Sequence, residues 1–167
     1  MSAVQTSRML ARYNAWANRT LFDAVAALPP GEAAKERATL FKNMVNTLNH
    51  LYVVDLIWQA HLQGREHGIA ALSSVLHAEL EELWRAQQAI DAWYVGWSDA
   101  LTEAAAEEMV QFKLIGGNPG AMRRADIMLH LVNHTSYHRG FVADLFYQVP
   151  ARPPLTDLPV YLRQTGS

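Results

Sequence analysis

The stretch HLVNHTSYHRG, residues 130–140, carries a histidine at every fourth position: His130, His134 and His138. Residues four apart are neighbours on one face of an α-helix, with Cβ atoms about 5–6 Å apart. The stretch lies within the segment 125–148, which Pro150 closes because proline lacks an N–H and cannot continue a helix. We therefore expect a long helix here, with imidazoles placed to share one metal ion.

Three further helices are expected toward the N-terminus. In the segment 2–28 apolar residues recur at steps of three and four, the pattern of an amphipathic helix, which Pro29-Pro30-Gly31 ends. The segment 40–62 is apolar on a wide face, so this helix should be well buried. The segment 74–97 begins after Ser73-Ser74, a possible N-cap.

The segment 98–124 has a weaker helical pattern. Residues 109–115 alternate between apolar and polar, and GGNPG at 116–120 is the densest turn signal in the chain, so we expect a short hairpin or irregular excursion. A brief helix over 158–163 closes the chain. These elements predict an all-α fold, a four-helix bundle forming one domain over residues 1–167.

Composition excludes several classes of protein. The 167 residues include no cysteine, which leaves His, Asp and Glu as metal ligands. The net charge is −2 and no long basic tract occurs, so no nucleic-acid partner is expected. No run approaches the ~18 apolar residues of a membrane span, and the N-terminus does not resemble a signal peptide. We expect a cytoplasmic protein without a membrane partner.

A third ligand must come from another helix, and His50 in the middle of the apolar segment 40–62 is the best candidate. His61, His67 and His77 lie near loop ends and are expected to be solvated. Two successive steps of four residues swing by about 80° around a helix, so His130 and His138 cannot both point ideally at one ion. The pair His134 and His138 is favoured by the resemblance described next, and His130 is then interpreted as an outer-shell or packing residue. The spacing alone is compatible with two interpretations: a metal site, or histidines that only pack in the core or lie on the surface.

Three stretches resemble the DinB/YfiT-like family of metalloenzymes. NHTSYHRG at 133–140 resembles the family's NHxxxHRG signature, and YNAWAN at 13–18 resembles its first helix. TLNHL at 47–51, followed by Asp55 and Trp58, resembles its second helix. The resemblance covers essentially the whole chain, in order.

The resemblance implies that His50, His134 and His138 bind one divalent metal ion. Imidazole ligands suit zinc, nickel or iron and do not choose among them. Three neutral imidazoles leave coordination positions free, as in catalytic sites, where the ion can acidify a bound water or thiol. The family often has a second histidine before the last one, where this chain has Tyr137.

The family also implies possible activities and partners. It includes transferases and isomerases that use low-molecular-weight thiols, and its members commonly form homodimers. We expect a metal-dependent enzyme that transfers or adds such a thiol to a small, electrophilic substrate and works as a homodimer. The alternatives are a non-catalytic metal-binding or stress-response protein, and a structural helical dimer with vestigial histidines.

Several polar residues near the ligands in sequence are candidates for an outer shell that orients the imidazoles. Asp55 and Arg139 have an alternative interpretation as a structural ion pair. Gly140 costs about 1 kcal/mol relative to alanine within a helix, and a close helix crossing is the expected compensation. The candidate outer-shell residues are Asn49, Asp55, Asn133, Tyr137 and Arg139.

Overall fold

The computed structural model describes residues 1–166. Its four long helices are α1 (Ala3–Ala26), α2 (Met44–Leu62), α3 (Leu80–Ala100) and α5 (Arg124–Phe146). The short elements are α4 (Glu103–Ala106), β1 (Met109–Lys113), β2 (Pro119–Arg123) and α6 (Leu158–Thr165). The expected mainly helical fold, with a hairpin before the last long helix, is confirmed.

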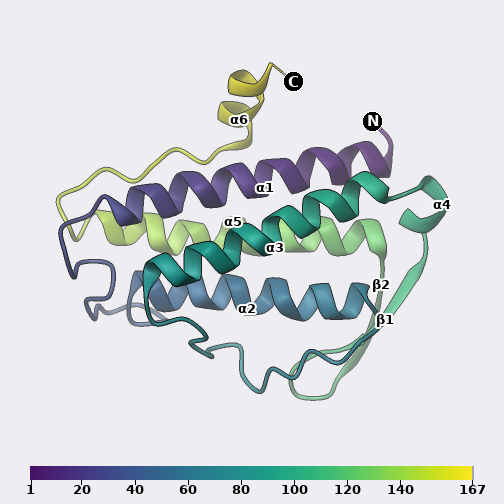
Figure 1. Cartoon of the computed structure of the whole chain (residues 1–167), viewed down its shortest axis with the longest axis horizontal. Coiled ribbons are helices and arrows are strands. Elements are labelled where there is room, and N and C mark those ends of the chain that lie inside the picture. Colours follow the sequence, from purple (N-terminus) through teal and green to yellow (C-terminus); the bar gives the residue numbers. More distant parts are fainter. Residues whose placement is uncertain (167) are drawn as a thin grey trace.

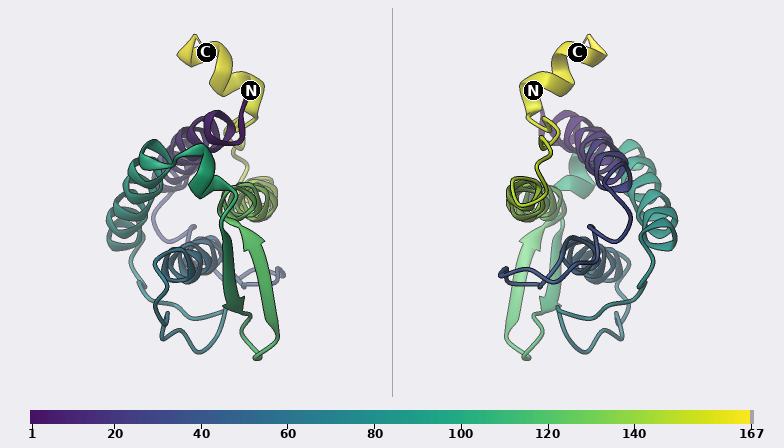
Figure 2. Two further views of the ribbon diagram at one scale, coloured as in Figure 1. Left: turned by 90° about the vertical axis from the view of Figure 1, so that its right-hand side faces the viewer. Right: turned by 90° about the vertical axis from the view of Figure 1, so that its left-hand side faces the viewer.

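The four long helices lie side by side with roughly aligned axes (Figure 1), and Figure 2 shows them viewed along these axes. α1 packs against α3 and α5, and α2 packs against α5 and α3. Their apolar faces form two main core clusters, one containing Trp58, Ile127 and Leu131, the other Leu48, Leu83 and Phe146. No helix in the described part of the chain is long and apolar enough to cross a membrane.

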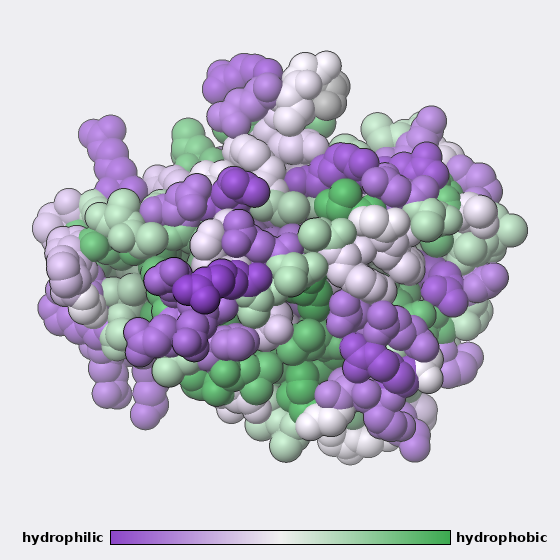
Figure 3. Space-filling view, in the orientation of Figure 1, coloured by the Kyte–Doolittle hydropathy of each residue, from purple (hydrophilic) through white to green (hydrophobic). Residues whose placement is uncertain are grey.

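α2 is apolar around most of its circumference, as its sequence predicts. Hydrophobic side chains gather low in the space-filling view, where Figure 1 shows α2 and the chain beside it (Figure 3). The helix begins at Met44 and not at 40, because the side chain of Asn43 accepts a hydrogen bond from Asn46 N and caps it. Leu40 and Phe41 therefore precede the helix and belong to the loop.

The hairpin is held by the antiparallel pairing of β1 with β2, in which Phe112 lies opposite Gly120. A Cβ on Gly120 would lie 2.5 Å from the Phe112 ring, so only glycine allows this side chain to cover the partner strand. Phe112 in turn meets Trp58 of α2, with ring centroids 4.9 Å apart. The hairpin is thereby fixed against the helices.

The prediction that the third helix begins at Ser74 is wrong, because α3 begins at Leu80. The cause is the fully buried side chain of Asn49 in α2, whose oxygen accepts hydrogen bonds from Leu76 N and His77 N. Its amide nitrogen donates to His77 O at 2.7 Å. These three bonds occupy backbone groups that a helical turn would need, so the chain stays extended there.

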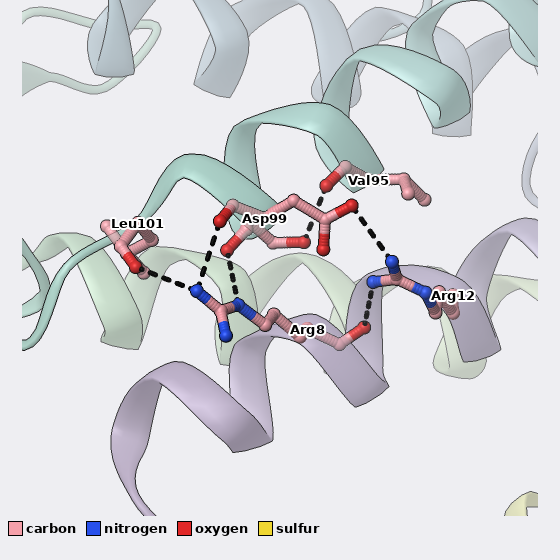
Figure 4. Close-up of polar contacts among 6 residues, drawn as sticks. Arg8, Arg12, Val95, Asp99 and Leu101 are labelled. Atoms are coloured by element: carbon pink, nitrogen blue, oxygen red, sulfur yellow. Dashed lines mark hydrogen bonds and ion pairs between the residues drawn. The ribbon is translucent and has the colours of Figure 1, made fainter.

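The N-terminal half of α1 is tied to the C-terminal end of α3 (Figure 4). Arg8 donates to the backbone oxygens of Ser98, Asp99 and Leu101, and Arg12 donates to the Asp99 carboxylate. The last carbonyls of a helix lack partners within the helix and carry partial negative charge, so a guanidinium satisfies both needs.

A buried polar network joins all four long helices. Arg139 of α5 donates to Asn14 Oδ1 and Asn18 Oδ1 of α1, at 2.7 and 3.0 Å. Asn18 donates to both carboxylate oxygens of Asp91 in α3. Gln87 links Asp91 to Asp55 of α2 through two hydrogen bonds from its amide nitrogen. A buried charge is tolerated only when it is partnered, and this network partners the guanidinium through amides.

Burial raises the pKa of both carboxyl groups in the network. The pKa of Asp55 rises to about 8, because of desolvation first and the neighbouring Asp91 second. Desolvation raises the pKa of Asp91 to about 6, and hydrogen bonds from Gln87 and Asn18 oppose the rise. Desolvation thus favours the protonated form of both carboxyl groups, and the neighbouring Asp91 adds to this effect at Asp55.

Replacing Asn49 by alanine should lower the free energy of unfolding by about 1–3 kcal/mol, because it leaves the Leu76 and His77 backbone groups without partners. Amide exchange over residues 70–79 should become faster. Urea unfolding with a chelator present and hydrogen–deuterium exchange test this. Asn133→Ala, at an exposed position of α5, is the control and should change stability by less than about 0.5 kcal/mol. Equal stability of the two variants would contradict the assigned role.

The Asp55 network should also make stability fall as pH rises. Both carboxyl pKa values lie higher in the folded state than their ordinary value of 3.8, so the folded state binds more protons. The stability that this contributes is fully present below the unfolded pKa and is lost as pH rises through the folded value of about 8. Relative to Asp55→Asn, the wild type should lose at least ~1 kcal/mol of stability between about pH 6.5 and 8.5.

Urea unfolding over this pH range, with a chelator present, measures the loss. Histidines with lowered pKa values act in the opposite sense in the lower part of this range, because their unfolded rings, with a pKa of about 6.5, still bind protons there. Asp55→Asn contains the same histidines and keeps an oxygen for Gln87 but cannot ionise, so the difference between the two pH profiles isolates the contribution of the carboxyl group. A wild-type profile parallel to that of Asp55→Asn would contradict the raised pKa.

Candidate metal centre

Three imidazoles meet between α2 and α5. His50 Nε2 lies 3.2 Å from His134 Nε2 and 3.2 Å from His138 Nε2. One nitrogen from each residue lies within 4.8 Å of the other two, so the group could hold a metal ion. The structure thus brings together the three residues that the sequence proposed, with His134 and His138 one helical turn apart and His50 on the facing helix.

The spacing of these nitrogens fits a small divalent cation. Nitrogens about 2.0–2.1 Å from a tetrahedral zinc ion lie about 3.3 Å from each other. The two observed separations from His50 are 3.2 Å. Three imidazole nitrogens without a carboxylate or thiolate form a donor set that suits zinc, nickel or iron. The residues present therefore fit the ion that the sequence analysis proposed.

The tautomer of His50 follows from its backbone partner. Its Nδ1 lies 2.9 Å from the carbonyl oxygen of Leu72, which can only accept, so Nδ1 carries the proton. The lone pair of the neutral ring is then on Nε2, which faces the other two histidines. A carbonyl oxygen on the second nitrogen is the arrangement that orients ligand imidazoles and makes them more basic.

His134 and His138 are positioned differently, by ring packing. Their Nδ1 atoms are buried and have no hydrogen-bond partner among the described residues. Phe141 and Tyr137 present edges to the His138 ring, with centroids 5.1 and 5.0 Å away. Phe41 stacks on His50 at 4.4 Å. Aromatic contacts therefore restrict the His138 ring, whose Nδ1 has no hydrogen bond to orient it.

Burial keeps the three imidazoles neutral. Desolvation is the largest cause in each case, and it lowers the pKa of His50. The pKa of His134 falls to about 3 and that of His138 to about 4, and neighbouring histidines add to both shifts. Neutral rings have the lone pair that binding to a cation requires, so no proton has to be displaced near neutral pH.

The cluster opens onto a cleft of about 540 Å³. Its walls come from three loops: the one before α2, the one between α2 and α3, and the hairpin turn. The lining residues are Leu40, Phe41, His50, Ala70, Ala71, Leu72, Ser73, Ile115, His134 and His138. The loop residues of this lining could not be predicted from the sequence, because no periodicity or spacing marks a loop that is placed by long-range contacts.

The remaining histidines lie outside the cluster. His130 packs against Trp58, with centroids 4.9 Å apart, and its ring centroid is 6.0 Å from that of His134. The expectation that His61, His67 and His77 are solvated is only partly correct, since each is half-buried. His61 meets Trp58 and Phe112, and His77 meets Tyr52.

The structure separates the candidate outer-shell residues. Asp55 and Arg139 belong to the buried network, and no direct ion pair between them forms in the described chain. Asn49 supports the loop whose Leu72 carbonyl meets His50. Asn133 is exposed, and Tyr137 is 64% exposed although its ring touches His138.

The predicted close helix crossing at Gly140 is wrong. This glycine is exposed, and a Cβ added to it would have no neighbour within 4 Å. No packing contact therefore explains the glycine.

Comparison with known proteins agrees with the resemblance seen in the motifs. The model of the DinB family matches residues 1–166. The protein named Protein DinB from Bacillus subtilis (strain 168) is 26% identical over 160 residues, which cover 93% of each chain. With its three histidines on the second and last long helices, this chain belongs to the DinB family.

Proposed function

We propose that this protein is a divalent-metal-dependent enzyme in which His50, His134 and His138 hold the ion. The observation that carries the proposal is the convergence of three neutral imidazole nitrogens at the wall of an open cleft. A closed structural site has four protein ligands, whereas only three such groups meet among the described residues. The remaining coordination positions would be available to a ligand from the cleft.

When bound, a divalent cation in such a site lowers the pKa of a coordinated water or thiol and so supplies a nucleophile near neutral pH. The protein's own residues position the reactants. Leu72 O and Phe41 fix the His50 ring, and apolar loop residues form the walls of the cleft. Apolar walls screen charge less than water does, which would strengthen the attraction between the ion and an anionic donor.

The cleft favours transfer of a thiol over hydrolysis. Apart from the histidines, Ser73 is the only polar residue in its lining, and none of the lining residues is a carboxylate that could act as a general base. A thiol needs no such base once its pKa is lowered, whereas hydrolysis by water generally uses one. We infer an S-transferase or isomerase that acts on a small electrophilic substrate.

The absence of a general acid or base from the lining also favours a second candidate, a non-catalytic metal-binding or stress-response protein. A reaction in which small thiols displace chloride from an activated aryl chloride, with thioether, chloride and a proton as products, separates the two when it is run with zinc-loaded protein. Turnover that is lost in His50→Ala supports the enzyme. Stoichiometric metal without turnover across a panel of thiols and electrophiles supports the alternative.

His138→Ala should abolish stoichiometric metal binding and leave the helical content nearly unchanged. Loss of a group that only supports a ligand typically weakens metal binding by about 10–100-fold, so loss of a ligand should cost more. The apolar core clusters do not depend on an ion and should keep the fold. Elemental analysis of protein purified without a nickel column, with circular dichroism alongside, measures both.

Two matched controls sharpen this test. His130→Ala removes the histidine of the same helix that packs on Trp58, and His77→Ala removes one near Tyr52. Both variants should retain the metal. If His130→Ala loses it as completely as His138→Ala, the ligand assignment is wrong by one helical turn.

We also propose that the protein forms a homodimer through α5. Half of its residues are hydrophobic, and large side chains are exposed along this helix at Leu129 and Tyr137 and at its C-cap, Tyr147, at 56, 64 and 73% exposure. Gly140 is exposed on the same helix and leaves room for close approach. Large exposed apolar side chains that gather on one face are typical of interaction sites.

Light scattering should therefore report a dimer, and Leu129→Glu should shift it toward monomer by at least about tenfold in dissociation constant, because a buried, unpaired carboxylate is costly. Leu155→Glu, at a residue 68% exposed and outside α5, should leave the dimer intact. A wild-type monomer over a wide concentration range would refute the proposal.

A further inference from the structure

The cleft beside the three histidines is lined mainly by apolar residues. Six of its ten lining residues are Leu, Ile, Phe or Ala, and the polar ones are the three histidines and Ser73. None of the ten is Lys, Arg, Asp or Glu. A ligand in this cleft therefore meets no charged side chain in its lining.

The cations nearest in sequence to the lining are directed elsewhere. Lys42 follows Phe41, but its Nζ lies 4.0 Å from the Glu36 carboxylate. Lys113, two residues before Ile115, lines a different cleft together with His61 and Arg65. A ligand carrying several carboxylates would have to give up their hydration without gaining ionic partners, which is costly.

Four apolar residues of the lining are exposed to water: Ala70, Ala71 and the larger Leu40 and Leu72. Leu40 is 72% exposed and Leu72 is 44% exposed. Covering such side chains with an apolar ligand gains about 25 cal/mol for each Å² of apolar surface removed from water. The volume of about 540 Å³ falls within the ~300–1,000 Å³ range of small-molecule sites.

We propose that this cleft selects a predominantly apolar small molecule that carries a single donor group for the ion, and discriminates against hydrophilic thiols with several carboxylates. The inference rests on the proposed function, because the donor group needs the ion. Leu72 is the residue that joins the two parts of the site. Its side chain lines the cleft, and its carbonyl oxygen accepts the Nδ1–H of His50.

The test uses zinc-loaded, dialysed full-length protein and calorimetric titration with three probes. 4-Phenylbutane-1-thiol has an apolar body and one thiol, mercaptosuccinate has a thiol and two carboxylates, and 4-phenylbutan-1-ol lacks the thiol. We expect the first to bind at least roughly tenfold more tightly than either of the others. Equal or tighter binding of mercaptosuccinate overturns the selection for apolar ligands, and equal binding of the alcohol overturns the role of the donor.

Leu72→Lys supplies the cation that the lining lacks and keeps the backbone carbonyl that meets His50. It should weaken binding of 4-phenylbutane-1-thiol and strengthen binding of mercaptosuccinate, so that the ratio of their affinities falls at least roughly tenfold. Leu155→Lys adds the same charge at an exposed residue outside the cleft and should leave the ratio unchanged. An unchanged ratio in Leu72→Lys contradicts the proposal.

Elemental analysis of the titrated sample distinguishes failure of this inference from failure of the proposed function. One zinc per chain without a preference among the probes overturns the inference and leaves the metal site standing. No retained zinc overturns the proposed function, and the inference falls with it.

Discussion

The orientation of the candidate metal centre depends on a buried guanidinium. Arg139 is 2% exposed, and its hydrogen bonds go to Asn14 and Asn18 of α1 and to Ser136 of its own helix. Successive residues of a helix point about 100° apart, so directing Arg139 toward α1 fixes the direction of His138. A rotation of α5 that moved the histidines away from His50 would also strip the buried charge of its partners. The buried charge of Arg139 therefore fixes the orientation of α5, and with it the positions of His134 and His138 relative to His50.

The loops around the centre are tied to the same helix that supplies His50. Asn49 holds the backbone at residues 76–77, and the neighbouring His50 donates to Leu72 O. Two adjacent residues of α2 therefore fix a loop that has no secondary structure of its own. The loop forms part of the cleft lining, so a displacement of the His50 ring would also move this wall of the cleft.

Much of this arrangement could be predicted from the sequence, because it depends on periodicity. The spacing of four residues predicts that His134 and His138 share one helix face, and the apolar residues around His50 predict that it lies on a buried helix. The start of α3, the contacts of Arg139 and the cleft walls could not be predicted in this way. Each depends on side chains far apart in sequence: Asn49 with residues 76–77, Arg139 with Asn14, and Phe41 with His50. Local pattern gives no information on which distant backbone group a buried amide will meet.

Charge balance connects the interior network with the candidate site. The two carboxyl groups of the network face Arg139, Asn18 and Gln87 in the interior and do not line the cleft. The three imidazoles are neutral, and no carboxylate lines the cleft. A divalent ion held there would receive no compensating charge from these residues, and the apolar lining would screen its charge poorly. Its strongest available partner is then an anionic donor on the ligand itself. Under the proposed function, an uncharged donor set in an apolar cleft therefore makes the ligand's single ionised group the main source of binding selectivity.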